Sequence, residues 1–374
     1  MSVKRSAITA AAVTAGIMSL ALPAGAATAA SAAAVAKAAA KPIAVSTSWP
    51  TARSGIALTY SKIGTGGRPT LLETTNAGAT WRKLPAPPIT YPADNDIPDA
   101  TWGSGIITVT SGTRIVASRD AGKHWSAVRL AGLPKARSLF VGPVTIADGR
   151  LFALVNTITA SGTSTEAVYS GSARADTMRA VAGLSISGSL AYGDLTAAGG
   201  AIQVSLGANF ARAVYRVSRN GTHFLAAPLP CPASRHTLLG GVRDGKPVAL
   251  CSTEASSVGP GTNSHRVWIG ARLGGQFKPA GKVLTSSNEQ GFAAASDKDM
   301  VMSTTFPLYV TSNAGQSWTP KLPQQNGATW SDLAFQSSTT GVADTLTVNN
   351  SLKFVGTVYR TTNGGRTWRA LVLP

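Results

Sequence analysis

Cysteine, histidine and glutamate are scarce in this chain, and each shortage excludes a class of site. The 374 residues include two cysteines, four histidines and four glutamates. The histidines lack the spacing of a metal site, so we expect neither a metal nor a cofactor. Cys231 and Cys251 have no histidine signature of a reactive thiol around them. An oxidising compartment would pair them, so we predict a Cys231–Cys251 disulfide, with two free thiols as the alternative.

Apolar runs long enough to span a membrane are also missing. The longest, from Ile8 to Leu22, has about 15 residues, whereas a membrane-spanning helix needs roughly 20. Lys4 and Arg5 precede this run and small residues follow it, which is typical of a secretory signal peptide. We therefore expect a signal peptide over residues 1–26, whose cleavage site is left open, an Ala/Lys-rich linker over 27–43, and one folded, secreted domain over 44–374.

Acidic residues are fewer than half as numerous as basic ones, 16 against 34. Loss of Lys4 and Arg5 with the signal peptide would leave 32 basic and 16 acidic residues, a formal charge of +16. The basic residues are scattered rather than clustered with aromatic ones, which argues against a nucleic-acid partner. An exported basic protein more naturally meets an anionic cell-envelope polymer, phospholipid or acidic glycan. The alternative is that the charge serves solubility alone.

One short segment occurs four times. Each copy has Ser or Thr, then Asn or Asp two residues on, Gly two further, and Trp three beyond that. The Asx side chain can close a turn by accepting backbone hydrogen bonds, the Gly permits a positive φ, and the Trp can bury its ring against a neighbouring sheet. The Asx, Gly and Trp positions are Asn76, Gly78 and Trp81; Asp120, Gly122 and Trp125; Asn313, Gly315 and Trp318; and Asn363, Gly365 and Trp368.

Weaker copies fill the gap between the second and third strong ones, with Met178, Phe224 and Phe277 in place of Trp. The resulting anchors lie 41 to 53 residues apart, a period typical of one four-stranded propeller blade. Short β-branched runs such as 105–110 and 114–118 surround the copies, and no long amphipathic helix is evident. The sequence therefore predicts an all-β fold, a single propeller of seven four-stranded blades.

The recurring segment resembles the Asp-box, or BNR repeat, of sialidase-type propellers, photosystem II assembly factors and sortilin-type receptors. Three copies carry Asn where that family has Asp, and only Asp120 matches it. The resemblance implies that each box forms the turn between the third and fourth strands of a blade, away from the ligand face. Box residues are therefore expected to be structural. Activity is not implied, because the family spans hydrolases, assembly factors and receptors.

Sialidase chemistry in that family uses three arginines, a Tyr with a Glu partner, an Asp acid and an Arg-Ile-Pro segment. No Arg-Ile-Pro occurs here, and Glu73 stands beside a box. We therefore predict no catalytic residues and lean against an enzyme. The alternative is a glycoside hydrolase or lyase with paired carboxylates, for instance an Asp of residues 94–99 with Glu254.

Two kinds of loop form the ligand face in such propellers: those between consecutive blades and those between second and third strands. Three aspartates gather within residues 91–99, while residues 253–266 and 156–166 are predicted to be long loops. A solvated turn is the alternative for the aspartates. Together these features predict a secreted, monomeric, non-catalytic propeller that binds a glycan, an anionic envelope polymer or a protein. The candidate ligand residues are Tyr91, Asp94, Asp96, Asp99, Glu254, His265 and Arg266.

Overall fold

The computed structural model describes residues 43–61, 66–91, 97–198, 201–232, 236–254, 262–305, 307–322, 329–348 and 354–374. The predicted signal peptide and all but the last residue of the predicted linker lie outside these ranges. The described residues form 28 strands and no helix. Among them, then, no helix has the length and apolarity that crossing a membrane requires. The all-β prediction agrees with this structure.

The strands follow one another in consecutive runs of four. The first runs are β1 (Ile43–Ser48), β2 (Gly55–Tyr60), β3 (Pro69–Thr74), β4 (Arg82–Leu84); β5 (Asp99–Gly103), β6 (Ile106–Ser111), β7 (Arg114–Ser118), β8 (Ser126–Ala131); and β9 (Ser138–Ala147), β10 (Arg150–Ile158), β11 (Ser164–Ser172), β12 (Thr177–Gly188). The next are β13 (Ala191–Ala198), β14 (Ala201–Ala208), β15 (Arg212–Ser218), β16 (Leu225–Ala226); and β17 (His236–Arg243), β18 (Lys246–Glu254), β19 (Thr262–Gly270), β20 (Phe277–Ser287). The last are β21 (Glu289–Ala294), β22 (Met300–Thr304), β23 (Leu308–Thr311), β24 (Thr319–Leu322); and β25 (Thr329–Phe335), β26 (Gly341–Val348), β27 (Phe354–Thr361), β28 (Arg369–Ala370).

The sheets are not all of one size. Five have four strands, and one has eight in the order β5-β6-β7-β8-β12-β11-β10-β9. Within every run the neighbouring strands are antiparallel, whereas β8 and β12 join the two halves of the eight-stranded sheet by a short parallel pairing, Arg129 to Ala131 against Thr177 to Arg179. The sequence predicted separate four-stranded sheets throughout. The difference arises because β12 extends far enough for its first residues to pair with the edge strand of the preceding run.

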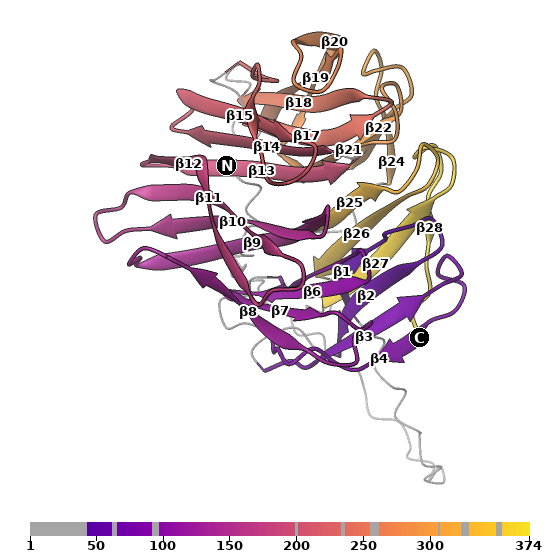
Figure 1. Ribbon diagram of the computed structural model, residues 1–374. Helices are drawn as coiled ribbons and strands as arrows, with labels where there is room; N and C mark the ends of the chain where they lie inside the picture. The colour runs from indigo at the N-terminus through magenta and orange to yellow at the C-terminus, as the bar shows by residue number, and fades with distance from the viewer. Residues whose placement is uncertain are drawn as a thin grey trace, which may run out of the picture.

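The sheets are arranged as a ring. The first strand of each run contacts the first strand of the next, from β1 through β5, β9, β13, β17 and β21 to β25, and β25 in turn contacts β1. Figure 1 shows the yellow C-terminal strands beside the indigo N-terminal ones. Sheets arranged in chain order around a central axis, with short antiparallel strands, are the architecture of a β-propeller.

Among the described residues no sheet contains strands from both ends of the chain, so side chains and close backbone contact hold the ring closed. An apolar cluster joins Ala44 and Trp49 of the first run to Val342, Val358 and Leu371 of the last. The Arg360 guanidinium also donates a 2.7 Å hydrogen bond to the carbonyl of Ala52. The first and last runs are therefore held together without a shared strand.

The box turns are built alike. In the first, the backbone N–H of Gly78 donates to the Thr74 hydroxyl over 2.9 Å, and the N–H of Thr80 donates to Asn76 Oδ1 over 2.9 Å. The same pair of bonds recurs at 118–124, 311–317 and 361–367. The residue at the Gly position has a positive φ in all four turns. These are the hydrogen bonds that the repeated residues predict.

Each box packs against the sheet before its own. A Cβ added to Gly122 would contact Leu84, one on Gly315 would contact Val267, and one on Gly78 would meet Leu371 of the last run. The four box tryptophans lie just before the fourth strands and are half-buried. Within the described residues their indole N–H groups have no hydrogen-bond partner. Apolar packing between adjacent sheets is therefore what these rings contribute.

The predicted disulfide is present. Cys231 and Cys251 are bonded, with their Cα atoms 5.5 Å apart. The β17–β18 hairpin turns at Asp244 and Gly245, which both have a positive φ, as an Asp-Gly hairpin turn requires. The bond fixes the segment before β17 to the middle of β18.

Replacing both cysteines by serine is expected to lower the free energy of unfolding by about 3 kcal/mol, the loop-entropy value for a closure of 20 residues. Urea unfolding of the double variant and the wild type, compared under non-reducing conditions, measures this. Equal urea midpoints would show that the bridge contributes nothing.

Candidate functional site

A cavity of about 470 Å³ lies on the axis of the ring. Its lining residues include members of six first strands: β5, β9, β13, β17, β21 and β25. A volume of this size is within the range of sites that bind small molecules or a few sugar units. Because first strands of most runs contribute, the site exists only once the ring has closed.

The cavity is acidic, although the chain as a whole carries a formal charge of +18. Among the lining residues in the described ranges there is no Arg, Lys or His. Apolar rings contribute as well, and among them Phe140 is 39% exposed. The carboxylates and rings at the cavity are Asp99, Glu166, Asp194, Asp332, Phe140, Phe292 and Trp330.

Two of these acids hold neighbouring first strands together. The backbone N–H of Leu239 on β17 donates to Asp194 Oδ2 of β13 over 2.6 Å, and that of Thr47 on β1 donates to Asp332 Oδ2 of β25 over 2.9 Å. Gln290 does the same between β21 and β25, accepting from the N–H of Trp330 over 2.9 Å. The cavity wall is thus cross-linked from strand to strand, which fixes the positions of its polar groups.

Glu166 on β11 is arranged differently. Asn156 on the paired strand β10 donates to Glu166 Oε2 over 2.8 Å, and no hydrogen bond within the described residues involves Oε1. The residue is only 3% exposed and lines the cavity. The absence of a side chain at Gly193 on β13 makes room for the Glu166 side chain, because an added Cβ at Gly193 would lie 3.1 Å from Glu166 Cγ and 2.8 Å from Leu206.

Burial shifts the protonation of two cavity acids. It raises the pKa of Glu166 to about 7, against the opposing effect of the Asn156 hydrogen bond. It also raises the pKa of Asp194, although the hydrogen bond from the N–H of Leu239 favours the ionised form. The charge of the cavity therefore changes close to neutral pH.

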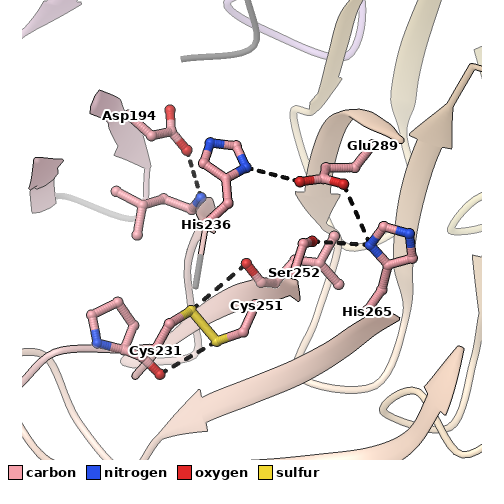
Figure 2. Close-up of a disulfide and its surroundings, with 10 residues drawn as sticks. Asp194, Cys231, His236, Cys251, Ser252, His265 and Glu289 are labelled. Atoms are coloured by element: carbon pink, nitrogen blue, oxygen red, sulfur yellow. Dashed lines mark hydrogen bonds and ion pairs between the residues drawn. A yellow bond between two sulfur atoms is a disulfide. The ribbon is translucent and has the colours of Figure 1, made fainter. Parts of the chain in front are cut away.

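A second polar cluster lies beside the cavity, between β17, β19 and β21 (Figure 2). Glu289 Oε1 is 2.8 Å from His236 Nδ1, and Oε2 is 3.6 Å from His265 Nδ1. Asn263 donates to the same Oε2 over 2.9 Å. Figure 2 shows the Glu289 carboxylate between the two imidazole rings. All three ionisable side chains are buried.

The cluster does not have the geometry of a serine–histidine–acid relay. Ser252 Oγ lies 2.9 Å from His265 Nδ1, which is the nitrogen that faces Glu289. The other nitrogen, Nε2, lies 3.2 Å from the carbonyl oxygen of Ser287. A relay needs the serine on one ring nitrogen and the acid on the other. We therefore assign the cluster to the joining of β17, β19 and β21.

The structure brings one of the candidate ligand residues, Asp99, to the cavity. Tyr91 is 2% exposed and packs edge-on against Tyr60, with ring centroids 5.3 Å apart. His265 is buried in the cluster around Glu289 rather than lying on the ligand face. Arg266 is half-buried on β19, paired with Cys251. Asp94, Asp96 and the side chain of Glu254 lie outside the described residues.

Three cavity acids were not among the residues predicted from the sequence: Glu166, Asp194 and Asp332. Residues 156–166 were predicted to be a long loop, but Asn156 and Glu166 face each other in paired strands. A signal for the two aspartates was present. Residues 192–195 and 330–333 both consist of an aromatic residue, a small residue, Asp and Leu, in that order. Each of the two aspartates accepts a hydrogen bond from a backbone N–H of the next first strand around the ring.

The part of the chain that the structure describes holds no group of three or more His, Cys, Asp or Glu placed to bind a metal ion. The polar groups at the cavity can instead accept hydrogen bonds from a ligand, because carboxylates are acceptors when ionised. What the site can do chemically is hold a hydroxyl-bearing or cationic ligand against apolar rings.

Comparison with known proteins gives similarity in fold alone. No family model matches the chain, and no curated protein sequence matches it. A chain from a structural analysis of two prolyl endopeptidases shares 10% identity with a TM-score of 0.54, covering 88% of this chain and 50% of its own. An ulvan lyase of a polysaccharide lyase family shares 10% identity with a TM-score of 0.51, covering 86% of this chain and 93% of its own. The β-propeller domain of the Trilobed protease from Pyrococcus furiosus aligns with a TM-score of 0.49 and 9% identity, covering 89% and 96%.

Proposed function

We propose that this chain is an exported β-propeller of seven four-stranded blades that binds a carbohydrate chain in its central cavity without cleaving it. The observation that carries the proposal is the cavity itself, about 470 Å³ in volume and lined by carboxylates together with exposed ring surface. Sugar hydroxyls donate hydrogen bonds that carboxylates accept, and sugar faces pack against aromatic rings.

The count of seven blades is supported by the runs of strands. The eight-stranded sheet consists of two antiparallel runs of four, β5–β8 and β9–β12, and the strand pairing that joins them is the short parallel contact of their outer strands, β8 and β12. Both runs supply a first strand to the ring, as the other five runs do. Counting each run as one blade gives seven.

The charge of the cavity limits the classes of ligand that can bind there. The overall charge of the chain favoured an anionic envelope polymer as the ligand. On the described cavity wall, however, every charged side chain that such a polymer would contact is acidic. Like charges at close range in a poorly solvated site cost free energy. We therefore place any anionic partner on the outer surface and a glycan without acid groups in the cavity.

Binding of neutral oligosaccharides by the exported chain, measured by calorimetry, tests this proposal. Replacing Phe140 by alanine is expected to weaken binding about tenfold, because its ring is a partly exposed part of the cavity wall. Phe210→Ala is the matched control, since that ring is 42% exposed but does not line the cavity. Failure of every oligosaccharide to bind, or equal affinities of the two variants, would contradict the proposal.

A glycoside hydrolase is the second candidate function, and one observation favours it. Glu166 has a pKa raised to about 7, the range of a general acid, and it adjoins β13, which carries Asp194. Release of new reducing ends from a bound oligosaccharide, lost in Glu166→Gln, would establish hydrolysis in place of binding alone.

A further inference from the structure

We infer that the central cavity selects a carbohydrate that carries protonated amines, and that the carboxylate of Glu166 receives an ammonium group of this ligand. The ligand class is therefore a polymer of amino sugars with free amino groups. The inference rests on the proposed function, since it names the glycan that the same cavity would take.

The charge of the cavity wall favours a cationic ligand over a neutral or an acidic one. Every charged residue that lines the described cavity is acidic, and these acids come from four different strands: β5, β11, β13 and β25. A cationic group that enters is attracted to all of them at once, whereas a neutral sugar gains only hydrogen bonds. An acidic sugar is repelled. Low solvation within a closed ring strengthens these interactions relative to water.

One oxygen of Glu166 accepts no hydrogen bond from the described residues. Asp194 and Asp332 use a carboxylate oxygen to hold the next first strand, at 2.6 and 2.9 Å. Glu166 joins no two first strands, and among the described residues only its Oε2 is hydrogen bonded. Its Oε1 is an acceptor on a residue that lines the cavity and is only 3% exposed. An ammonium group offers three donors and a full charge to such an oxygen.

Neighbouring residues fix the position of the Glu166 carboxylate. Gly193 leaves space for the Glu166 side chain, and Asn156 fixes its orientation through Oε2. The register places Asn156 of β10 and Ile186 of β12 opposite Glu166, and neither titrates. The titratable groups on the strand packed against it, β13, are Tyr192 and Asp194, and neither is a cation. Among the described residues no Arg, Lys or His forms an ion pair with Glu166, and its printed hydrogen bond comes from Asn156.

The experiment compares two oligosaccharides that differ only at the amine. A glucosamine hexamer has free amines, and an N-acetylglucosamine hexamer has the same backbone with each amine capped. Calorimetry at pH 7 is expected to show the free-amine hexamer binding at least about tenfold more tightly, the range of one charge-assisted hydrogen bond. Glu166→Gln is expected to abolish most of this preference, by weakening binding of the free-amine hexamer far more than binding of the capped one. Glu73→Gln, a buried glutamate on β3 paired with Arg82, is the matched control and should keep the preference.

The possible results distinguish a failure of the amine preference from a failure of the proposed glycan binding. If only the capped hexamer binds, or both bind equally, the amine preference is wrong while the glycan-binding function stands. If neither binds, the proposed function fails. If the preference persists in Glu166→Gln, the ammonium contact with Glu166 is wrong.

A measurement on the wild type covers the case in which Glu166→Gln does not fold. Because burial raises the pKa of Glu166 to about 7, most of this carboxyl is protonated at pH 6, and an ammonium that binds it must displace that proton. Titration at pH 6 in two buffers of different ionisation enthalpy is expected to show proton release with the free-amine hexamer and none with the capped one. Equal proton release for the two ligands would overturn the inference.

Discussion

Replacing Glu289 by alanine is expected to lower the free energy of unfolding by about 3 to 5 kcal/mol, the cost of removing one partner from a buried polar network. The Glu289 carboxylate joins His236 of β17 and His265 of β19 to β21 through contacts of 2.8 and 3.6 Å. It is also the acceptor for the Asn263 side chain. The alanine variant therefore leaves several buried polar groups unsatisfied at the junction of two neighbouring sheets.

The same cluster predicts a loss of stability in acid. Burial alone would raise the pKa of Glu289, but the hydrogen bond and charge of His236, with the charge of His265, outweigh it and lower the pKa to about 2. A carboxylate whose pKa is depressed by folding stabilises the protein above its unfolded pKa of 4.5 and ceases to do so as the pH falls towards 2. Burial also lowers the pKa of His265, so stability from this residue declines below pH 6.5. Both effects act in the same direction.

Urea unfolding of the wild type, Glu289→Ala and Glu289→Gln at pH 7 and at pH 3 measures both expectations. The difference between the wild type and the variants should shrink at the lower pH, because the wild-type carboxylate then approaches protonation. Asp176→Asn is the control: its carboxylate is more than half exposed and pairs with Arg119, so a change below about 1 kcal/mol is expected. A Glu289 variant as stable as this control would show that the cluster does not hold the sheets.

The propeller could be predicted from the sequence because its signal is repeated. A box with Gly and Trp at fixed offsets appears four times, and each copy needs only its own eight residues to form its turn. The disulfide was equally accessible, since the chain has no other cysteine. Local hydrogen bonding determines these features, and the sequence records it directly.

The cavity could not be predicted in the same way. Glu166, Asp194 and Asp332 are distant in sequence and come together only because their strands meet around one axis. Residues 156–166 are rich in Ser, Thr and Gly, which is typical of a loop, yet Asn156 hydrogen bonds Ser164 and Glu166 across paired strands. Polar residues that satisfy one another can line the inside of a ring, so composition alone misplaces them.

The sequence also did not show to which side of its strand each side chain points. His265 and Arg266 were both assigned to the ligand face, although neighbours on a strand point to opposite sides. In the structure His265 faces Glu289. That choice depends on how β19 registers with β18 and β20, which single-sequence patterns leave undetermined where polar and apolar residues do not alternate.

Gly356→Ala is expected to destabilise the protein by about 3 kcal/mol or more at the point where the ring closes. Gly356 on β27 passes so close to β1 that an added Cβ would overlap the backbone nitrogen, carbon and oxygen of Ala44. Backbone atoms cannot rotate away, so one of the two strands must shift. The first and last runs share no strand, and they depend on this contact and on the apolar cluster around Trp49 and Leu371.

Hydrogen exchange with urea unfolding measures where the Gly356→Ala variant fails. Amides of β1 and β27 should lose protection before those of β13 or β17 on the far side of the ring, because only the first and last runs are forced apart. Gly142→Ala on β9 is the matched control, since its Cβ would lie at an ordinary 3.4 Å from the carbonyl oxygen of Leu154. Its expected cost is below about 1 kcal/mol, close to the intrinsic difference between Gly and Ala in a strand. Equal stability of the two variants, or a uniform loss of protection around the ring, would mean that contact between β27 and β1 does not decide closure.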